Sequence, residues 1–241
     1  MFPIRDHNPS ARTPWVTRAI IALNIFIYLL TADWGGNMQR LWVAGALYPD
    51  AILHGAYLHG LFTHMFLHAG LMHIAGNMLF LWVFGDNLED QLGHFGFALF
   101  YLAGGLAAAA AQIATEPSSE IPMVGASGAI AAVMGGYMLL FPRARVDILF
   151  IFFVIYKIFT VPAYLVLGVW FALQLANSLG ATADGVAYWA HAGGFIAGVV
   201  LMVPHFARLG ATRFWRQTHG LPPHPSIDYV RSSVPSVRRR R

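Results

Sequence analysis

The chain has 241 residues, of which 57% are hydrophobic and only 11% are charged. An ordinary soluble domain carries about 25% charged residues, so this composition excludes a disordered chain or a coiled coil and indicates a polytopic membrane protein. The absence of cysteine excludes a disulfide scaffold, a thiolate nucleophile and Cys-ligated zinc. The formal net charge of +4 does not indicate nucleic-acid binding, because the basic residues gather near the chain ends. We therefore expect no nucleic-acid partner.

Six apolar segments approach the length of about 20 residues that a membrane span needs. Residues 35–69 are patchy in hydrophobicity and predict a membrane-hugging loop with short helices. Lys157 and Pro162 separate a surface-lying stretch from the fifth span. We expect an all-α membrane protein, a six-transmembrane-helix bundle over 16–204, between a short cytoplasmic segment, 1–15, and a basic, disordered cytoplasmic tail, 205–241. The expected spans are 16–33, 70–85, 95–114, 127–141, 161–179 and 186–204.

The basic residues indicate which way the chain is oriented. An even number of spans places both termini on one side, and that side then holds 14 of the 15 Lys and Arg residues, with Arg40 alone opposite. Positive charge is enriched in cytoplasmic segments. We therefore expect an integral multi-pass protein in the lipid bilayer, with both termini in the cytoplasm.

Polar side chains at membrane depth are costly and therefore suggest function. His73, Ser127 and His191 lie 13, 14 and 13 residues before Asp86, Phe141 and Pro204, which mark the cytoplasmic ends of the second, fourth and sixth spans. At about 1.5 Å per residue, each lies roughly 20 Å above that boundary. Asn77 is one turn deeper than His73 on the same helix face. The spacing therefore places His73, Ser127 and His191 at a common depth, with Asn77 one turn below them.

Small residues allow the fourth and sixth spans to approach closely. Gly128, Ala132 and Gly136 repeat at four-residue spacing, and Gly194 and Gly198 form a Gly-x-x-x-Gly pair. Such spacing lets helix backbones approach in a bilayer. A serine and a histidine on these helices can then reach hydrogen-bonding distance, as a nucleophile and its base require.

The loop before Ser127 must dip into the membrane if the fourth helix begins below the surface. Irregular backbone is tolerated there only against protein or a water-filled cavity. Gly125 and Gly128 permit a tight turn into the helix. The free N–H groups at the helix start form a site for an oxyanion.

These residues resemble the motifs of rhomboid intramembrane serine proteases. The resemblance covers about residues 16–204 and rests on three motifs in the second, fourth and last spans. They are GASGAI beginning at Gly125, His-x-x-x-Asn beginning at His73, and AHAGG beginning at Ala190.

The resemblance implies an endopeptidase that cleaves single-span membrane proteins in or beside the membrane segment, without a cofactor or metal. Ser127 would be the nucleophile, His191 the general base, and a third acid would be absent. The resemblance is to the six-transmembrane bacterial type of rhomboid, which implies the bacterial cytoplasmic membrane. The remaining implied roles are His73, Asn77, Gly125 and Ala126 at the oxyanion hole, and His68, Gly128, Gly194 and Gly198 as structural residues.

The sequence departs from the family pattern at two places, one in the first loop and one near His191. The Trp-Arg pair of the first loop is absent, since the aligned stretch reads LHGLF from Leu58. Ala131 stands where some members carry an aromatic residue near the histidine.

Two alternatives remain from the sequence. His64 and His68 have the i, i+4 spacing of a metal pair, which would suit a metal or proton transporter. No Asp or Glu lies clearly within a span, however, and transport sites usually carry carboxylates there. A catalytically weak rhomboid-like protein that binds membrane helices is the other alternative.

Overall fold

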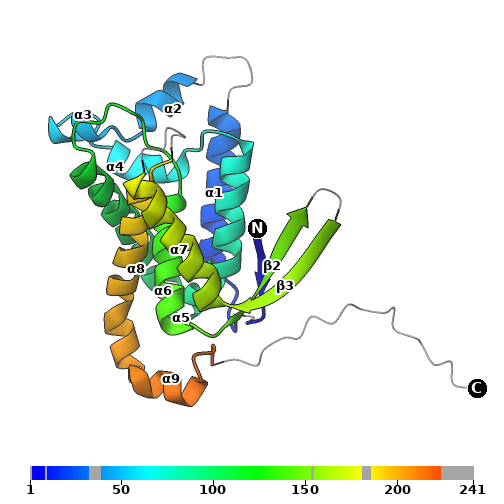
Figure 1. Cartoon of the computed structure of the whole chain (residues 1–241). Helices are drawn as coiled ribbons and strands as arrows, with labels where there is room; N and C mark the ends of the chain where they lie inside the picture. Colours follow the sequence, from blue (N-terminus) through cyan, green and yellow to red (C-terminus); the bar gives the residue numbers. More distant parts are fainter. Residues whose placement is uncertain (1, 9, 33–38, 153–154, 181–185, 224–241) are drawn as a thin grey trace, which may run out of the picture.

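The computed structural model describes residues 2–8, 10–32, 39–152, 155–180 and 186–223. This part of the chain is mostly helical and includes one three-stranded sheet. Figure 1 shows α2 and α3 at one end of the bundle, and the sheet in the half that carries α9. The elements are β1 (Phe2–Asp6), α1 (Trp15–Thr31), α2 (Gln39–Gly45), α3 (Pro49–Leu53), α4 (Gly60–Thr63), η1 (His64–Phe66), α5 (Leu71–Thr115), α6 (Ser127–Leu140), β2 (Arg145–Phe152), β3 (Ile155–Pro162), α7 (Ala163–Leu179), α8 (Tyr188–Arg208) and α9 (Thr212–Thr218).

The long element α5 is two helices joined at a kink. Gly93 has φ +71°, a left-handed conformation that glycine adopts without steric strain. The two halves correspond to the expected second and third spans. The first half continues beyond residue 85, the expected end of the second span, so the acidic residues between Asp86 and Asp90 lie in its last turns.

One of these acidic residues, Glu89, caps the start of α1. Its carboxylate accepts hydrogen bonds from the backbone N–H groups of Val16 and Thr17 and from the Thr17 hydroxyl, at 2.7–2.8 Å. The residue before α1, Pro14, makes no side-chain cap. A carboxylate at a helix N-terminus satisfies free N–H groups and complements the helix dipole. Glu89 therefore fixes α1 against the end of the first half of α5.

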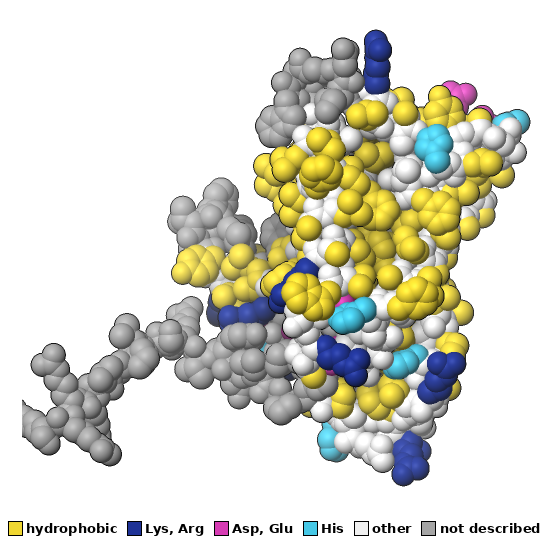
Figure 2. Space-filling view, turned by 180° about the vertical axis from the view of Figure 1, so that it is seen from behind, with side chains coloured by type: hydrophobic (Ala, Val, Ile, Leu, Met, Phe, Trp, Pro, Cys, Tyr) yellow, Lys and Arg dark blue, Asp and Glu magenta, His cyan; other side chains and the backbone are white. Residues whose placement is uncertain are grey.

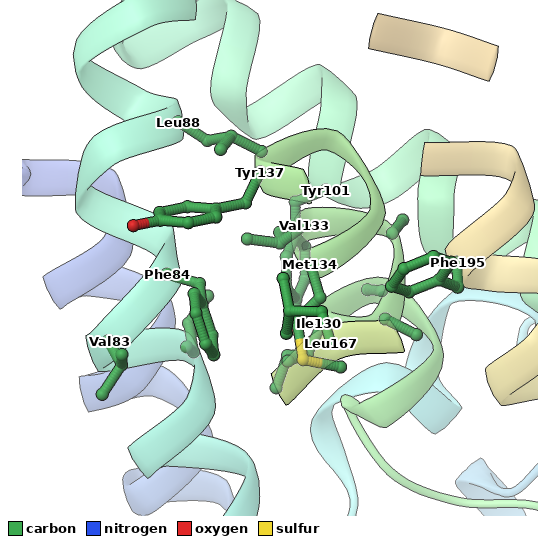
Figure 3. Close-up of a cluster of buried hydrophobic side chains, with 14 of the residues drawn as sticks. Val83, Phe84, Leu88, Tyr101, Ile130, Val133, Met134, Tyr137, Leu167 and Phe195 are labelled. Atoms are coloured by element: carbon green, nitrogen blue, oxygen red, sulfur yellow. The ribbon is translucent and has the colours of Figure 1, made fainter. Parts of the chain in front are cut away.

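The core of the bundle surrounds α6, whose residues are nearly all buried. Helix α6 packs against both halves of α5 and against α8, and its glycines and alanines keep the helices close. Figure 3 shows the large side chains around it, including Phe84 from α5, Leu167 from α7 and Phe195 from α8. The Phe84 and Tyr137 rings meet edge to face, with centroids 5.0 Å apart. A small-residue helix inside a ring of larger side chains thus positions the elements that carry the site.

Two described helices, α5 and α8, are long and apolar enough to cross a membrane, and α1, α6 and α7 are shorter apolar helices. Many large apolar side chains of α1, α7 and α8 are exposed rather than buried. Figure 2 shows hydrophobic side chains across the middle of the visible face, with most basic side chains in the lower half of the view. This surface suits a bilayer, and the number of crossings stays a prediction.

The expectation of an all-α fold is wrong in one region. The stretch before the fifth span, which we expected to be a surface-lying stretch, forms the hairpin β2–β3, and β1 from the chain start pairs antiparallel with β2. Both hairpin strands are rich in β-branched and aromatic residues, which favour strands. The N-terminal segment 1–15 therefore supplies an edge strand to a sheet built mostly from the middle of the chain.

The sheet is held by Asp147, which is buried in its central strand. Asp147 accepts hydrogen bonds from Arg5 at 2.7 Å and from Thr160 at 2.5 Å, and His7 Nε2 lies 2.8 Å away. Arg5 and Thr160 are its direct cross-strand partners in the register. Hydrogen bonds, the one to Thr160 first, hold the pKa of Asp147 below its usual value despite burial. One carboxylate therefore joins all three strands.

A second polar cluster joins β1 to the helices. Asp6 accepts hydrogen bonds from the Tyr137 hydroxyl of α6 at 3.0 Å and from the Asn87 amide of α5 at 2.8 Å. Burial, together with the nearby charge of Asp86, raises the pKa of Asp6 to about 7. The chain start is therefore fastened to the bundle by an acid that is partly protonated near neutral pH.

Part of the tail that we expected to be disordered, 205–241, is helical. Residues 205–208 complete α8 and residues 212–218 form α9, in which Phe214 is buried. The Trp215 indole donates to the Leu139 carbonyl at 3.0 Å, which holds α9 against the end of α6. Residues 224–241 lie outside the described part of the chain.

Candidate active site

Ser127 is the first residue of α6, and the loop before it is built to expose the helix start. Gly125 has φ +128°, and a Cβ at that position would lie 2.8 Å from His73 Nε2. The Gly125 N–H donates to the His64 carbonyl at 2.9 Å. Further back, Leu47 and Met123 exchange two backbone hydrogen bonds of 3.0 and 2.8 Å. Backbone hydrogen bonds from the first loop therefore fix residues 123–125, which lead into Ser127.

His64 acts in this loop as a structural residue. Its Nδ1 lies 2.8 Å from the Gly60 carbonyl, which can only accept, so Nδ1 carries the proton. Burial lowers the pKa of His64 to about 4, so that its ring is neutral near neutral pH. Within the described residues, no group of three or more His, Asp or Glu side chains has the arrangement of a metal site.

Ser127 and His191 meet directly. Ser127 Oγ lies 2.8 Å from His191 Nε2, although 64 residues separate them in the sequence. The neighbouring glycines allow this, since Gly194 and Gly198 lie against the backbone of α6 at Gly128 and Ala132. The histidine is supplied by α8 and the serine by the start of α6. Their distance is that of a nucleophile and its base.

His73 lies beside the same helix start. Its Nδ1 accepts a hydrogen bond from the Ala69 N–H at 3.4 Å, so the proton of the neutral ring belongs on Nε2. That nitrogen faces Gly125, the residue before Ala126 and Ser127. An N–H donor is therefore directed toward the start of α6.

Asn77 supplies a second donor in the same region. It is only 8% exposed, and its Nδ2 has no hydrogen-bond partner among the described residues. Buried amide groups are almost always paired, so an unpaired one calls for a functional explanation. The side chain lines the cavity beside Ser127, where a substrate oxygen would supply the partner.

His68 lies behind His73 rather than in the cavity lining. Their rings meet edge to face with centroids 5.2 Å apart, and neither ring nitrogen of His68 has a partner among the described residues. Burial, and secondly His73, lowers the pKa of His68 to about 3. His68 is therefore a neutral packing residue in this structure.

A cavity of about 900 Å³ opens over these side chains. Its wall includes Ser127, His191, His73 and Asn77, and its lining is more apolar than polar. Glu116 is the only carboxylate among its described lining residues. A volume of about 900 Å³ is in the range of ligand-binding pockets, and the Ser127 side chain lies on its wall.

Three residues near His191 were missed in the sequence. Gln174 of α7 places its Oε1 2.8 Å from His191 Nδ1, and the Trp170 ring lies 5.9 Å from the histidine ring. Gln112 of α5 accepts from the Ala190 N–H at 3.1 Å. The two glutamines could have been found from the sequence, because a polar amide within an apolar helix is costly and therefore suggests a role. Helix α7 thus supplies the support that Ala131 cannot give.

The structure thus brings a serine hydroxyl and a histidine ring nitrogen to hydrogen-bonding distance among apolar helices. A family model described as the Rhomboid domain matches residues 55–208, more than half of the chain. The chain therefore belongs to the rhomboid family and is a membrane protein, which confirms the resemblance seen in the sequence.

Several named relatives are similar over part of the chain. Rhomboid protease GluP of Bacillus subtilis is 35% identical over 52% of this chain and 24% of its own length. Rhomboid protein 1, mitochondrial, of Saccharomyces cerevisiae is 32% identical over 56% of this chain and 38% of its own. Rhomboid-related protein 2 of Mus musculus is 42% identical over 32% of this chain and 25% of its own length. The chain thus spans less than two fifths of the length of these relatives.

Proposed function

We propose that the protein is an intramembrane serine endopeptidase that cleaves single-span membrane proteins in or beside their membrane segment. The observation that supports this most is the 2.8 Å contact between Ser127 Oγ and His191 Nε2 on the wall of the cavity. Relatives named as rhomboid proteases support the same reaction class.

In the proposed reaction, Ser127 attacks the scissile carbonyl while His191 accepts the serine proton. The histidine then gives that proton to the leaving amine, and water hydrolyses the acyl-enzyme by the reverse sequence of proton transfers. The Ser127 N–H, at the first position of α6, has no intrahelical acceptor. With His73 and Asn77 it would stabilise the oxyanion.

The proposed substrates must unwind locally, because a helix buries its own carbonyls in hydrogen bonds. We expect small residues at the cut and helix-weakening Gly or Pro nearby. The strong asymmetry of basic residues supports an orientation with both termini in the cytoplasm. The bacterial cytoplasmic membrane and six crossings belong to the same proposal.

The test uses the full chain, purified and reconstituted in liposomes with a labelled single-span substrate. Ser127→Ala should abolish cleavage, whereas Ser178→Ala on α7 removes a hydroxyl that bonds the Leu175 carbonyl and should leave cleavage unchanged. Asn77→Ala should lower turnover by about 10²–10³, the usual cost of a lost oxyanion donor.

Each result has a defined meaning. Cleavage that survives Ser127→Ala would contradict the assignment of the nucleophile. Substrate that binds the wild-type chain but is never cut would support a helix-binding protein instead. Turnover of Asn77→Ala equal to the wild type would remove Asn77 from the oxyanion hole.

A further inference from the structure

Gln174 is an unusual residue in α7. This helix is largely exposed, and Ala163, Leu167 and Gln174 are its buried residues. Its apolar contacts with α8 are made by Trp170 and Phe171, both of which pack on Phe195. The buried amide therefore adds one polar contact to an interface that these rings make apolar.

The amide of Gln174 can be oriented from its two partners. Its Nε2 lies 3.4 Å from the Trp170 carbonyl, which can only accept, so the nitrogen end belongs there. The oxygen end then faces His191 Nδ1 at 2.8 Å. An amide oxygen can only accept, so His191 must carry its proton on Nδ1.

This protonation pattern is the one that general-base catalysis needs. With the proton on Nδ1, His191 Nε2 has a free lone pair, and Ser127 Oγ lies 2.8 Å from it. The other tautomer would direct an N–H at the serine and could not accept its proton. The backbone carbonyl of Trp170 therefore orients Gln174, and Gln174 orients His191.

We propose that Gln174 is a positioning residue that holds His191 in the tautomer and ring orientation required to activate Ser127. This inference rests on the proposed protease function. Because Gln174 belongs to α7 rather than to α6 or α8, separating α7 from α8 would also release His191. The position of α7 thus controls the base as well as the side of the cavity that includes Trp170.

Few titratable groups face His191. His73 approaches from α5, Tyr188 lies on α8 itself with its ring 6.3 Å away, and Glu116 lines the same cavity. On α7 the facing groups are Gln174 and Trp170, which do not titrate. A carboxylate at position 174 would therefore be a new charge beside the histidine.

The test compares Gln174→Leu and Gln174→Glu with Asn177→Leu, the same type of change three residues along α7. Gln174→Leu should lower kcat about tenfold with little change in KM, as expected for the loss of one buried hydrogen bond. Gln174→Glu should restore much of the rate at pH 8. It should also move the acidic limb of the pH profile to higher pH, because the carboxylate stabilises the imidazolium. Asn177→Leu should match the wild type.

A second readout does not depend on turnover. Nitrogen-15 NMR of labelled histidine, in the Ser127→Ala background, should report a proton on Nδ1 of His191, and in the same background Gln174→Leu should lose that preference. An unchanged tautomer and an unchanged kcat and pH profile in Gln174→Leu would overturn the inference. A wild-type chain that cuts no substrate would instead contradict the proposed function, and the NMR result would still decide whether Gln174 positions the histidine.

Discussion

Replacing Gly198 with alanine tests whether the contact between α6 and α8 sets the distance between serine and histidine. A Cβ at position 198 would lie 2.5 Å from both the Cα and the carbonyl carbon of Ala132, and closer still to its oxygen. Ordinary carbon–carbon contacts are about 3.5–4.0 Å. All three close atoms are backbone atoms, so the clash cannot be relieved by rotating a side chain. The helices must separate by about 1 Å.

That separation is large compared with the hydrogen bond it affects. Gly198 lies two turns from His191 on the same helix, and Ala132 lies five residues after Ser127. Adding about 1 Å to the present 2.8 Å would break the contact between Oγ and Nε2. A misplacement of about 1 Å can cost roughly 100-fold in rate. We expect Gly198→Ala to lose about two orders of magnitude in kcat and about 1–3 kcal/mol in stability.

The matched control is Gly168→Ala on α7, where a Cβ would meet nothing within 4 Å. Alanine is favoured over glycine inside a helix by about 1 kcal/mol, so this variant should be active and at least as stable as the wild type. Cleavage in liposomes and thermal melting in detergent would be measured for both. A Gly198→Ala protein that cleaves within twofold of the wild-type rate would refute the reasoning.

Three other predictions concern groups around the bundle. The pKa of Asp6 is raised in the folded state, so its stabilising contribution is complete below about pH 4 and is lost as the pH rises through about 7. Asp6→Asn should remove this pH dependence and raise the free energy of unfolding at pH 8 by up to about 4 kcal/mol. Equal dependence of stability on pH in the variant and the wild type would contradict this. Glu89→Gln should lower the free energy of unfolding by about 3 kcal/mol, because it weakens three hydrogen bonds at the start of α1. An unchanged melting temperature would show that this cap does not stabilise the fold. Cleavage should fall as acidification adds a proton to His191, because an imidazolium cannot accept the serine proton, and a rate that stays constant down to the pH at which the chain unfolds would exclude His191 as the base.

The helices near the site follow closely from local sequence. The expected fourth span, 127–141, corresponds to α6, Ser127–Leu140, and the expected fifth, 161–179, corresponds to α7, Ala163–Leu179. Apolar length, glycine and proline carry this information within a few turns of the chain. The motif at Gly125 was likewise readable, because its glycines lie directly at the helix start.

The sheet could not be predicted in the same way. Strand β2 pairs on one edge with β3 but on the other with β1, and more than 140 residues separate Asp147 from Arg5 in the sequence. A strand has no internal hydrogen bonds, so it exists only when its partner arrives. By itself, the sequence of the hairpin indicates an apolar segment next to the membrane. It does not indicate that a strand at the chain start pairs with it.

The sequence by itself determined the class of protein, the apolar segments and the polar residues at a common depth, because hydrophobic length and residue spacing are local properties. It placed Ser127, His191, His73 and Asn77 as candidates before any contact was known. Only the tertiary structure decided that α7 turns Gln174 toward His191 and that the buried Asn77 amide donor has no partner among the described residues. Those facts depend on how each helix is rotated about its axis, and that rotation is set by packing against neighbouring helices, which no single segment encodes.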